Sequence, residues 1–90
     1  MLIRVTQSDI DTGKKTDCYL CPVAIAINRA LGKDSSNFWG AQVYRTQLTP
    51  HLGYRQCLTP RRVEQFIVRF DHNLPVKPFN FRLRVERKDA

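Results

Sequence analysis

The sequence lacks the apolar runs that mark membrane and secreted proteins. No stretch approaches the roughly 18–20 apolar residues of a membrane-spanning helix, and the first ten residues, MLIRVTQSDI, turn polar too soon for a secretory signal peptide. The three cysteines are an odd number, which cannot close into a complete set of disulfides. We therefore expect a cytoplasmic protein with reduced thiols and no membrane partner.

The motifs of common enzyme classes are also missing. The chain has no H-E-x-x-H, P-loop, G-x-S-x-G or dinucleotide-binding turn, and it has only four glycines. Its carboxylates are scattered, and we find no nucleophile and base whose spacing suggests a pair. The sequence therefore predicts a protein that is not an enzyme, with no catalytic residues and no cofactor.

Acidic residues are scarce relative to basic ones. Eight Asp and Glu stand against fifteen Lys and Arg, which gives a net charge of +7. Residues 1–39 hold five basic and four acidic residues, whereas residues 40–90 hold ten and four. Ten of the basic residues are arginine, whose planar guanidinium suits phosphate and carboxylate. This balance favours an anionic partner, although such a charge also promotes solubility alone.

Four segments are expected to form strands: residues 2–6, 42–46, 54–58 and 79–86. The last is the most regular, because its apolar residues at 79, 81, 83 and 85 share one face while Arg82 and Arg84 share the other.

Two helices are expected between these strands. The first covers residues 22–32, because Pro22 suits the first turn of a helix and Gly32 suits its end. The second begins at Thr59 and Pro60, with Thr59 as the N-cap, and its apolar residues at 63, 66, 67 and 70 share one face. A further single turn is expected after residue 6.

The order strand, helix, strand, strand, helix, strand predicts the α+β fold class. The natural arrangement is a mainly antiparallel sheet of four strands with both helices on one face, which resembles a ferredoxin-like fold. No repeat or linker divides the chain, so residues 1–90 are expected to form one domain.

Cys18 and Cys21 lie directly before the helix expected at residues 22–32. The amides and dipole of a helix start favour thiolate, so either cysteine is a candidate redox thiol. Zinc is a second interpretation, with His51 as the nearest further ligand in the expected fold, although one C-x-x-C supplies only two of the four ligands. A third is that both cysteines pack as small apolar residues. The sequence leaves all three open.

Arg61 and Arg62 fall in the first turn of the second helix, where the positive end of the helix dipole disfavours cations. A bound anion would reverse this effect, because free amides and guanidinium groups would then converge on it. The alternative is that both are solvated arginines, paired with Glu64 or Asp34.

A wider basic rim is expected around this helix start. In the expected topology Lys33 and the C-terminal tail end at the same edge of the sheet. The open face of the sheet adds arginines and an aromatic, a combination that suits single-stranded RNA or stacked bases. The candidate ligand-binding residues are Thr59, Lys33, Arg61, Arg62, Arg82, Arg84 and Arg87.

Two N-terminal segments, VTQSDIDTG at residues 5–13 and DCYLCPVAIAI at residues 17–27, resemble small uncharacterised proteins encoded by tailed phages and prophages. The resemblance covers about the first third of the chain and implies no established activity or functional residue. Phage accessory proteins of this size often antagonise host defence, by blocking a nuclease complex or sequestering a nucleotide signal. The resemblance thus implies action in the cytoplasm of a host cell.

These observations predict a binding protein that captures a phosphate-bearing ligand, with a signalling nucleotide as the first expectation. A nucleic acid or ribonucleoprotein, bound in the manner of an anti-CRISPR protein, is the alternative, and an acidic host protein would suit the same charge. A zinc or dithiol module that uses Cys18 and Cys21 is the third expectation. A homo-oligomer is a further expectation, because a second subunit would deepen the shallow pockets of so small a domain.

Overall fold

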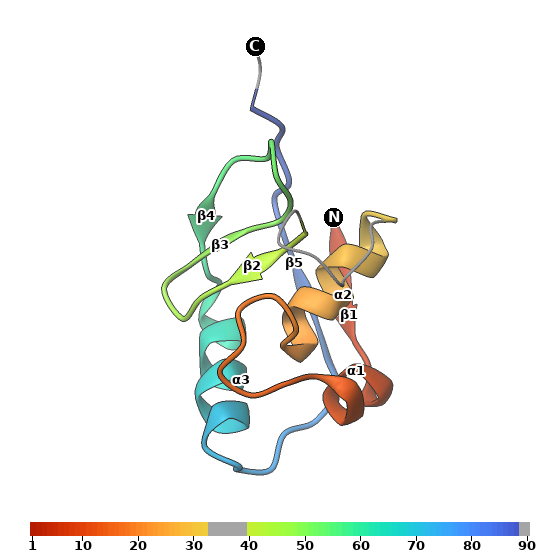
Figure 1. Cartoon of the computed structure of the whole chain (residues 1–90), viewed down its shortest axis with the longest axis vertical. Helices are drawn as coiled ribbons and strands as arrows, with labels where there is room; N and C mark the ends of the chain where they lie inside the picture. Colours follow the sequence, from red (N-terminus) through yellow and green to blue (C-terminus); the bar gives the residue numbers. More distant parts are fainter. Residues whose placement is uncertain (33–39, 89–90) are drawn as a thin grey trace.

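Two small antiparallel sheets and three helices form the part of the chain that the computed structural model describes, residues 1–32 and 40–88 (Figure 1). In the first sheet, β1 (Leu2–Val5) pairs with β5 (Phe79–Arg82). The second sheet has the order β2 (Gln42–Val43), β3 (Gln47–Thr49) and β4 (Cys57–Leu58). The α+β fold class is confirmed, but the described strands do not form the expected single sheet of four strands.

The expected strand at residues 42–46 is a hairpin instead. β2 ends at Val43, the amide of Tyr44 donates to the carbonyl of Gln47 over 2.9 Å, and the chain returns as β3. β3 therefore lies beyond the expected strand, at residues 47–49. The hairpin pairs with itself and with β4, so among the described residues none of its strands pairs with β1 or β5.

The expected strand at residues 79–86 is also divided between two partners. β5 pairs with β1 as far as Arg82, and the amide of Leu83 donates to the carbonyl of Met1. Beyond this point the chain runs along the β3–β4 connection, where the amide of Arg55 donates to the carbonyl of Glu86 over 2.7 Å. The C-terminal segment therefore ties the two sheets together.

α1 (Gln7–Thr12) and α2 (Pro22–Ala30) begin where the sequence predicts. The hydroxyl oxygen of Thr6 accepts a hydrogen bond from the amide of Asp9, and the Asp9 carboxylate accepts one from the amide of Thr6, which forms a capping box. Pro22 opens α2, and Gly32 follows its end with a φ of 67°, a left-handed conformation that glycine adopts freely.

α3 (Arg61–Asp71) begins one residue later than expected. Pro60 occupies the N-cap position and provides no side-chain hydrogen bond. The Thr59 hydroxyl, expected to cap the helix, instead donates to the carbonyl of Tyr44 over 2.7 Å and so joins the hairpin to the start of α3. No helix of the described residues is both long and apolar enough to span a bilayer.

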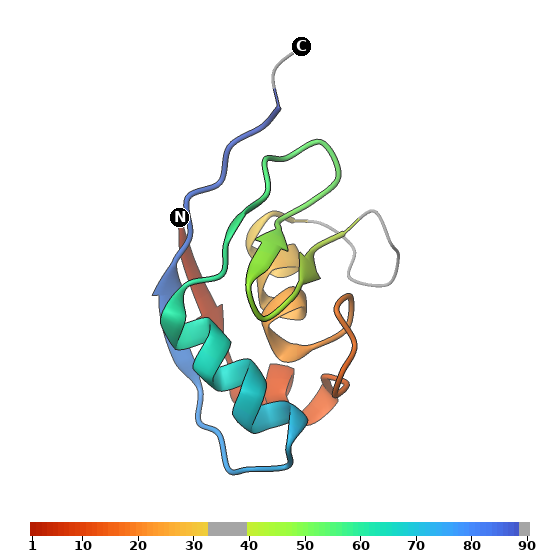
Figure 2. The same ribbon diagram turned by 90° about the vertical axis from the view of Figure 1, so that its left-hand side faces the viewer.

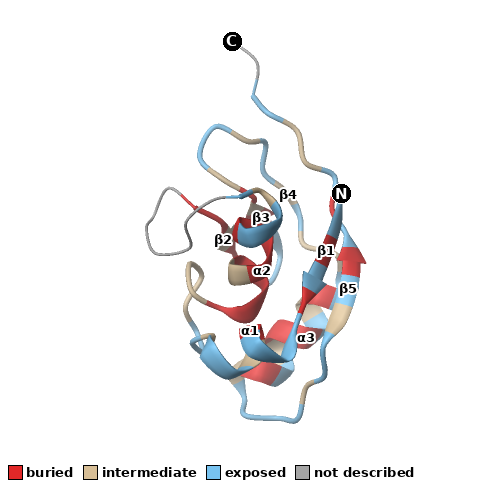
Figure 3. Cartoon of the chain, turned by 90° about the vertical axis from the view of Figure 1, so that its right-hand side faces the viewer, coloured by how far each residue is buried: buried red, intermediate tan, exposed pale blue. Residues whose placement is uncertain are grey.

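The hydrophobic core lies around α2, which contacts both β1 and β2 and so sits between the two sheets (Figures 2 and 3). Each fully buried Val, Ile or Leu contributes about 1.5–3 kcal/mol. Ile3 and Val5 of β1 point inward while Leu2 and Arg4 point outward, as the alternation predicts. α3 covers the core with the four apolar residues expected on one face, Val63, Phe66, Ile67 and Phe70.

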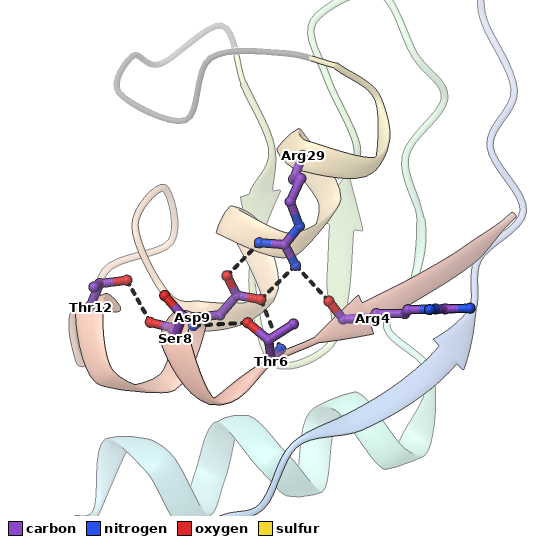
Figure 4. Close-up of polar contacts among 6 residues, drawn as sticks. All are labelled: Arg4, Thr6, Ser8, Asp9, Thr12 and Arg29. Atoms are coloured by element: carbon purple, nitrogen blue, oxygen red, sulfur yellow. Dashed lines mark hydrogen bonds and ion pairs between the residues drawn. The ribbon is translucent and has the colours of Figure 1, made fainter.

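An ion pair between the buried Asp9 and the half-exposed Arg29 joins three elements beside this core (Figure 4). The Asp9 side chain is 3% exposed, and Arg29 at the end of α2 donates to its two oxygens over 2.6 and 2.8 Å. The same guanidinium donates to the carbonyl of Arg4 in β1 over 2.8 Å. Arg29 therefore links the end of β1, the start of α1 and the end of α2.

The pKa of Asp9 reflects two opposing effects. Burial raises the pKa, but the hydrogen bonds from Arg29 and Thr6 together lower it by more, so it lies below the ordinary value of 3.8. The carboxylate is thus charged at neutral pH and depends on Arg29 for compensation.

Replacing Arg29 is expected to destabilise the fold, because it leaves a buried carboxylate without its cation. Arg29→Met should lower the free energy of unfolding by about 2–3 kcal/mol, measured by urea denaturation. Arg55→Met is the matched control, since Arg55 lies 3.9 Å from Glu86 at an exposed site; it should cost less than about 0.5 kcal/mol. Equal effects of the two substitutions would contradict the role assigned to Arg29.

The contribution of this ion pair should also depend on pH. Since the folded-state pKa of Asp9 lies below 3.8, the stabilisation is fully present at neutral pH and is lost as the pH falls through the folded-state value. The stability difference between the wild type and Arg29→Met should narrow as the pH falls, from the pH at which the unpaired Asp9 of the variant takes up a proton down to the folded-state pKa of Asp9 in the wild type. Urea denaturation across this range measures it, and a constant difference down to acid pH would refute the assignment.

Candidate functional site

Arg61 and Arg62 are both exposed, but they line different grooves on α3. Consecutive residues of a helix point about 100° apart, so two adjacent side chains reach opposite flanks of the same ridge. The structure therefore does not bring the two guanidinium groups together around one compact anion, as the sequence had suggested.

The first groove, called here the α3–hairpin groove, has a volume of about 730 Å³. Arg61 and Arg69 of α3 lie along it, and Arg45 reaches it from the β2–β3 turn. Thr59 is part of the lining, held there by its hydrogen bond to the hairpin. Glu64 is the one carboxylate among the described lining residues.

The second groove, called here the α3–β5 groove, has a volume of about 350 Å³. Three cations line it, namely Arg62, Arg69 and Lys77, and no acidic residue is among its described lining. The Arg62 guanidinium lies over the ring of Phe79, 5.7 Å from the ring centroid. Arg69 also donates from Nε to the carbonyl of Pro75 over 3.2 Å, which fixes its stem against the wall of this groove.

Three residues of these grooves were missed by sequence reasoning. Arg69 lies eight positions after Arg61 and seven after Arg62, so helical periodicity places it between them around the helix, and this signal was available in the sequence. Arg45 was assigned to a strand, and only the hairpin directs it toward α3. Lys77 follows the end of α3, where the sequence has no periodicity to place it.

The other predicted site residues lie apart from these grooves. Arg82 is exposed on the outer face of β5, opposite Leu2. Arg84 forms an ion pair with Glu86 over 2.5 Å, and Arg87 lies over the ring of Tyr54, 5.8 Å from its centroid. A ligand-binding role for these three arginines stays a prediction, and Lys33 lies outside the described residues.

The ion pairs among the described residues do not include the arginines that line the two grooves. They join Arg29 to Asp9, and both Arg55 and Arg84 to Glu86. Within the same part of the chain, no carboxylate lies within ion-pair distance of the arginines that line the two grooves. Those arginines therefore lie beside a concave surface without an ion-pair partner among the described residues.

Cys21 is the N-cap residue of α2, and its thiol is buried. Its Sγ accepts a hydrogen bond from the amide of Ala24 over 3.4 Å, and the residue is 5% exposed. Burial raises the pKa of the thiol to about 11, because it outweighs the amides of the helix start. Burial therefore opposes at Cys21 the thiolate that the helix dipole favours, and a redox role for this thiol stays a prediction.

Cys18 and His51 do not join Cys21 in a metal site. A hydrogen bond with the Cys18 thiol raises the pKa of the Tyr44 hydroxyl above its ordinary value. His51 packs its ring edge-on against Tyr54, with the centroids 5.9 Å apart. Across residues 1–32 and 40–88, no three His, Cys, Asp or Glu side chains come together as metal ligands.

The thiol of Cys21 should react slowly in the folded protein. A pKa of about 11 in place of 9.0 reduces the thiolate fraction at neutral pH about a hundredfold, so alkylation should be slower by at least this factor than in urea. Timed alkylation followed by peptide mass spectrometry measures the rate, with half-buried Cys18 as the internal control. Faster alkylation of Cys21 in the folded protein would instead support a redox thiol.

Comparison of the chain with protein-family models, with curated proteins and with solved structures found no match in any of the three. The arrangement of charge and shape on the described residues is therefore the basis on which a function is proposed.

Proposed function

We propose that the protein binds the phosphate backbone of a nucleic acid along α3. The observation that carries the proposal is that Arg45, Arg61, Arg62 and Arg69 line two adjoining grooves without an ion-pair partner among the described residues. Guanidinium groups bind phosphate oxygens through paired hydrogen bonds, and neutralising several phosphates releases counterions.

The divergence of Arg61 and Arg62 favours a chain of phosphates over one compact nucleotide. The two grooves share Gln65 and Arg69, which form the ridge between them. Successive phosphates that cross this ridge would meet Arg61 on one flank and Arg62 on the other. A single nucleotide would contact only one flank of this ridge. The signalling nucleotide expected from the sequence would therefore contact fewer of these arginines than a chain of phosphates.

The uncapped start of α3 adds a second attraction for phosphate. The first amides of a helix need acceptors from outside it. The N-cap Pro60 offers none from its side chain, and Arg61 and Arg62 occupy the positive end of the dipole. A phosphate oxygen near this end would accept from the amides and offset the repulsion between the dipole and the two arginines.

The resemblance to phage-encoded proteins supplies a setting for this activity. A small basic protein that covers a nucleic-acid segment would compete with a nuclease or ribonucleoprotein of host defence for the same strand. This role forms part of the proposal and depends on the resemblance, whereas backbone binding depends on the grooves.

Removing the groove arginines should weaken nucleic-acid binding selectively. Arg61→Gln/Arg62→Gln/Arg69→Gln should lower affinity at low salt and flatten the salt dependence, by about 0.7–0.9 in the logarithmic slope for each phosphate that is no longer neutralised. Fluorescence anisotropy with labelled oligonucleotides at several salt concentrations measures both. Lys14→Gln/Lys15→Gln/Arg55→Gln removes the same charge at exposed residues outside the grooves and should change both quantities less.

Two outcomes would count against the proposal. Equal reductions in affinity in the two triple variants would mean that net charge alone drives binding. Tight binding of a cyclic dinucleotide in calorimetry, abolished in Arg61→Gln and unaccompanied by oligonucleotide binding, would instead favour the signalling nucleotide.

A further inference from the structure

We infer that the α3–β5 groove receives an unpaired base, stacked on Phe79, so that the ligand is single-stranded. This inference rests on the proposed function and adds to it the class of nucleic acid. Proteins that bind single strands combine a cationic groove with an aromatic platform on which a base stacks.

The ring of Phe79 is held in place from beneath. It contacts Phe66 of α3 with the centroids 4.9 Å apart, and Phe81 with the centroids 5.8 Å apart. Phe66 and Phe81 are buried in the core, whereas Phe79 is partly exposed and forms part of the groove wall. A platform fixed by core packing loses little conformational entropy when a base stacks on it.

The groove already holds one planar cation over this ring. The Arg62 guanidinium covers Phe79 at 5.7 Å, the position in which a base would stack. Arg62 has a long, flexible side chain, and an outward movement would admit the base and leave the guanidinium on its far side. Arginine stacks on planar rings as well as binding phosphate, so the displaced side chain keeps a favourable partner.

Charge and size both favour a single base over a base pair. The cations Arg62, Arg69 and Lys77 lie around the ring with no carboxylate among the described lining, so the phosphates that flank the base would be attracted there. A volume of about 350 Å³ is near the lower limit of small-molecule sites, which suits one planar ring system. The bases of a duplex are stacked and paired, and so do not reach such a wall.

The surface continues beyond Phe79, which gives the strand a path. Phe79 also lines a shallow groove with Arg4, Thr6 and Asn80, at the outer ends of β1 and β5. A strand that places one base on Phe79 would therefore have cations on either side of it, from α3 and from β1. This continuity makes Arg4, which points outward from β1, a further backbone contact.

The test compares oligothymidylate, oligouridylate and a mixed-sequence DNA duplex, each of about 12 nucleotides per strand, by anisotropy at one salt concentration. The wild type should bind at least one of the two single strands more tightly than the duplex. The single strand that binds more tightly shows whether the protein prefers deoxyribose or ribose. Phe79→Leu should weaken single-strand binding by about tenfold and leave duplex binding unchanged. Tyr54→Leu is the matched control, because Tyr54 carries Arg87 over its ring at 5.8 Å outside the grooves.

Photocrosslinking gives a second measurement that needs no variant. A single strand that carries 5-bromouracil should crosslink to the peptide that contains Phe79. If circular dichroism shows that Phe79→Leu does not fold, the crosslinking result tests the inference by itself. Crosslinks confined to other peptides would overturn the inference.

The inference and the proposed function can fail separately. Equal affinity for single strand, duplex and base-free polyphosphate, with no effect of Phe79→Leu, would overturn the stacked base and leave backbone binding intact. Absence of binding to any oligonucleotide at low salt would overturn both.

Discussion

The buried carboxylate of Asp9 is the constraint on which the arrangement of the N-terminal half depends. A charge out of contact with water must be compensated, and Arg29 supplies the compensation from the far end of α2. The same guanidinium holds the carbonyl of Arg4, so β1, α1 and α2 meet at one point. With its end fixed there, α2 lies between the two sheets and provides the surface on which both are packed.

The other carboxylates explain where the free positive charge lies. Two of them accept hydrogen bonds from backbone amides. Asp17 accepts from the amides of Tyr19 and Leu20, and Asp71 accepts from the amide of Thr16. Glu86 pairs with arginines of the C-terminal segment. Among the described residues, Glu64 is the one carboxylate that lines the α3–hairpin groove. The fold converts a modest excess of basic residues into a cationic surface because most of the acidic residues that the structure describes form caps, turns and ion pairs elsewhere.

Local signals predicted the helices and failed for the sheets. The capping box at Thr6, the proline that opens α2 and the apolar face of α3 depend on neighbours a few residues apart, so the sequence displays them directly. The strand segments at residues 42–46 and 79–86 looked continuous, yet the first turns back after Val43 as a hairpin and the second changes partner after Arg82. Strand pairing depends on residues distant in the chain, and alternation alone does not say which edge a strand will meet.

The sequence by itself determined the fold class, the three helix starts to within a residue, the inward faces of β1 and α3, and the excess of positive charge. These follow from composition and from periodicity, both of which are local. Only the tertiary structure decided that Arg61 and Arg62 diverge, that Arg45 and Lys77 join them, and that burial of Cys21 outweighs the helix dipole. Groove membership and desolvation depend on which elements pack together, and that packing brings together residues far apart in the chain.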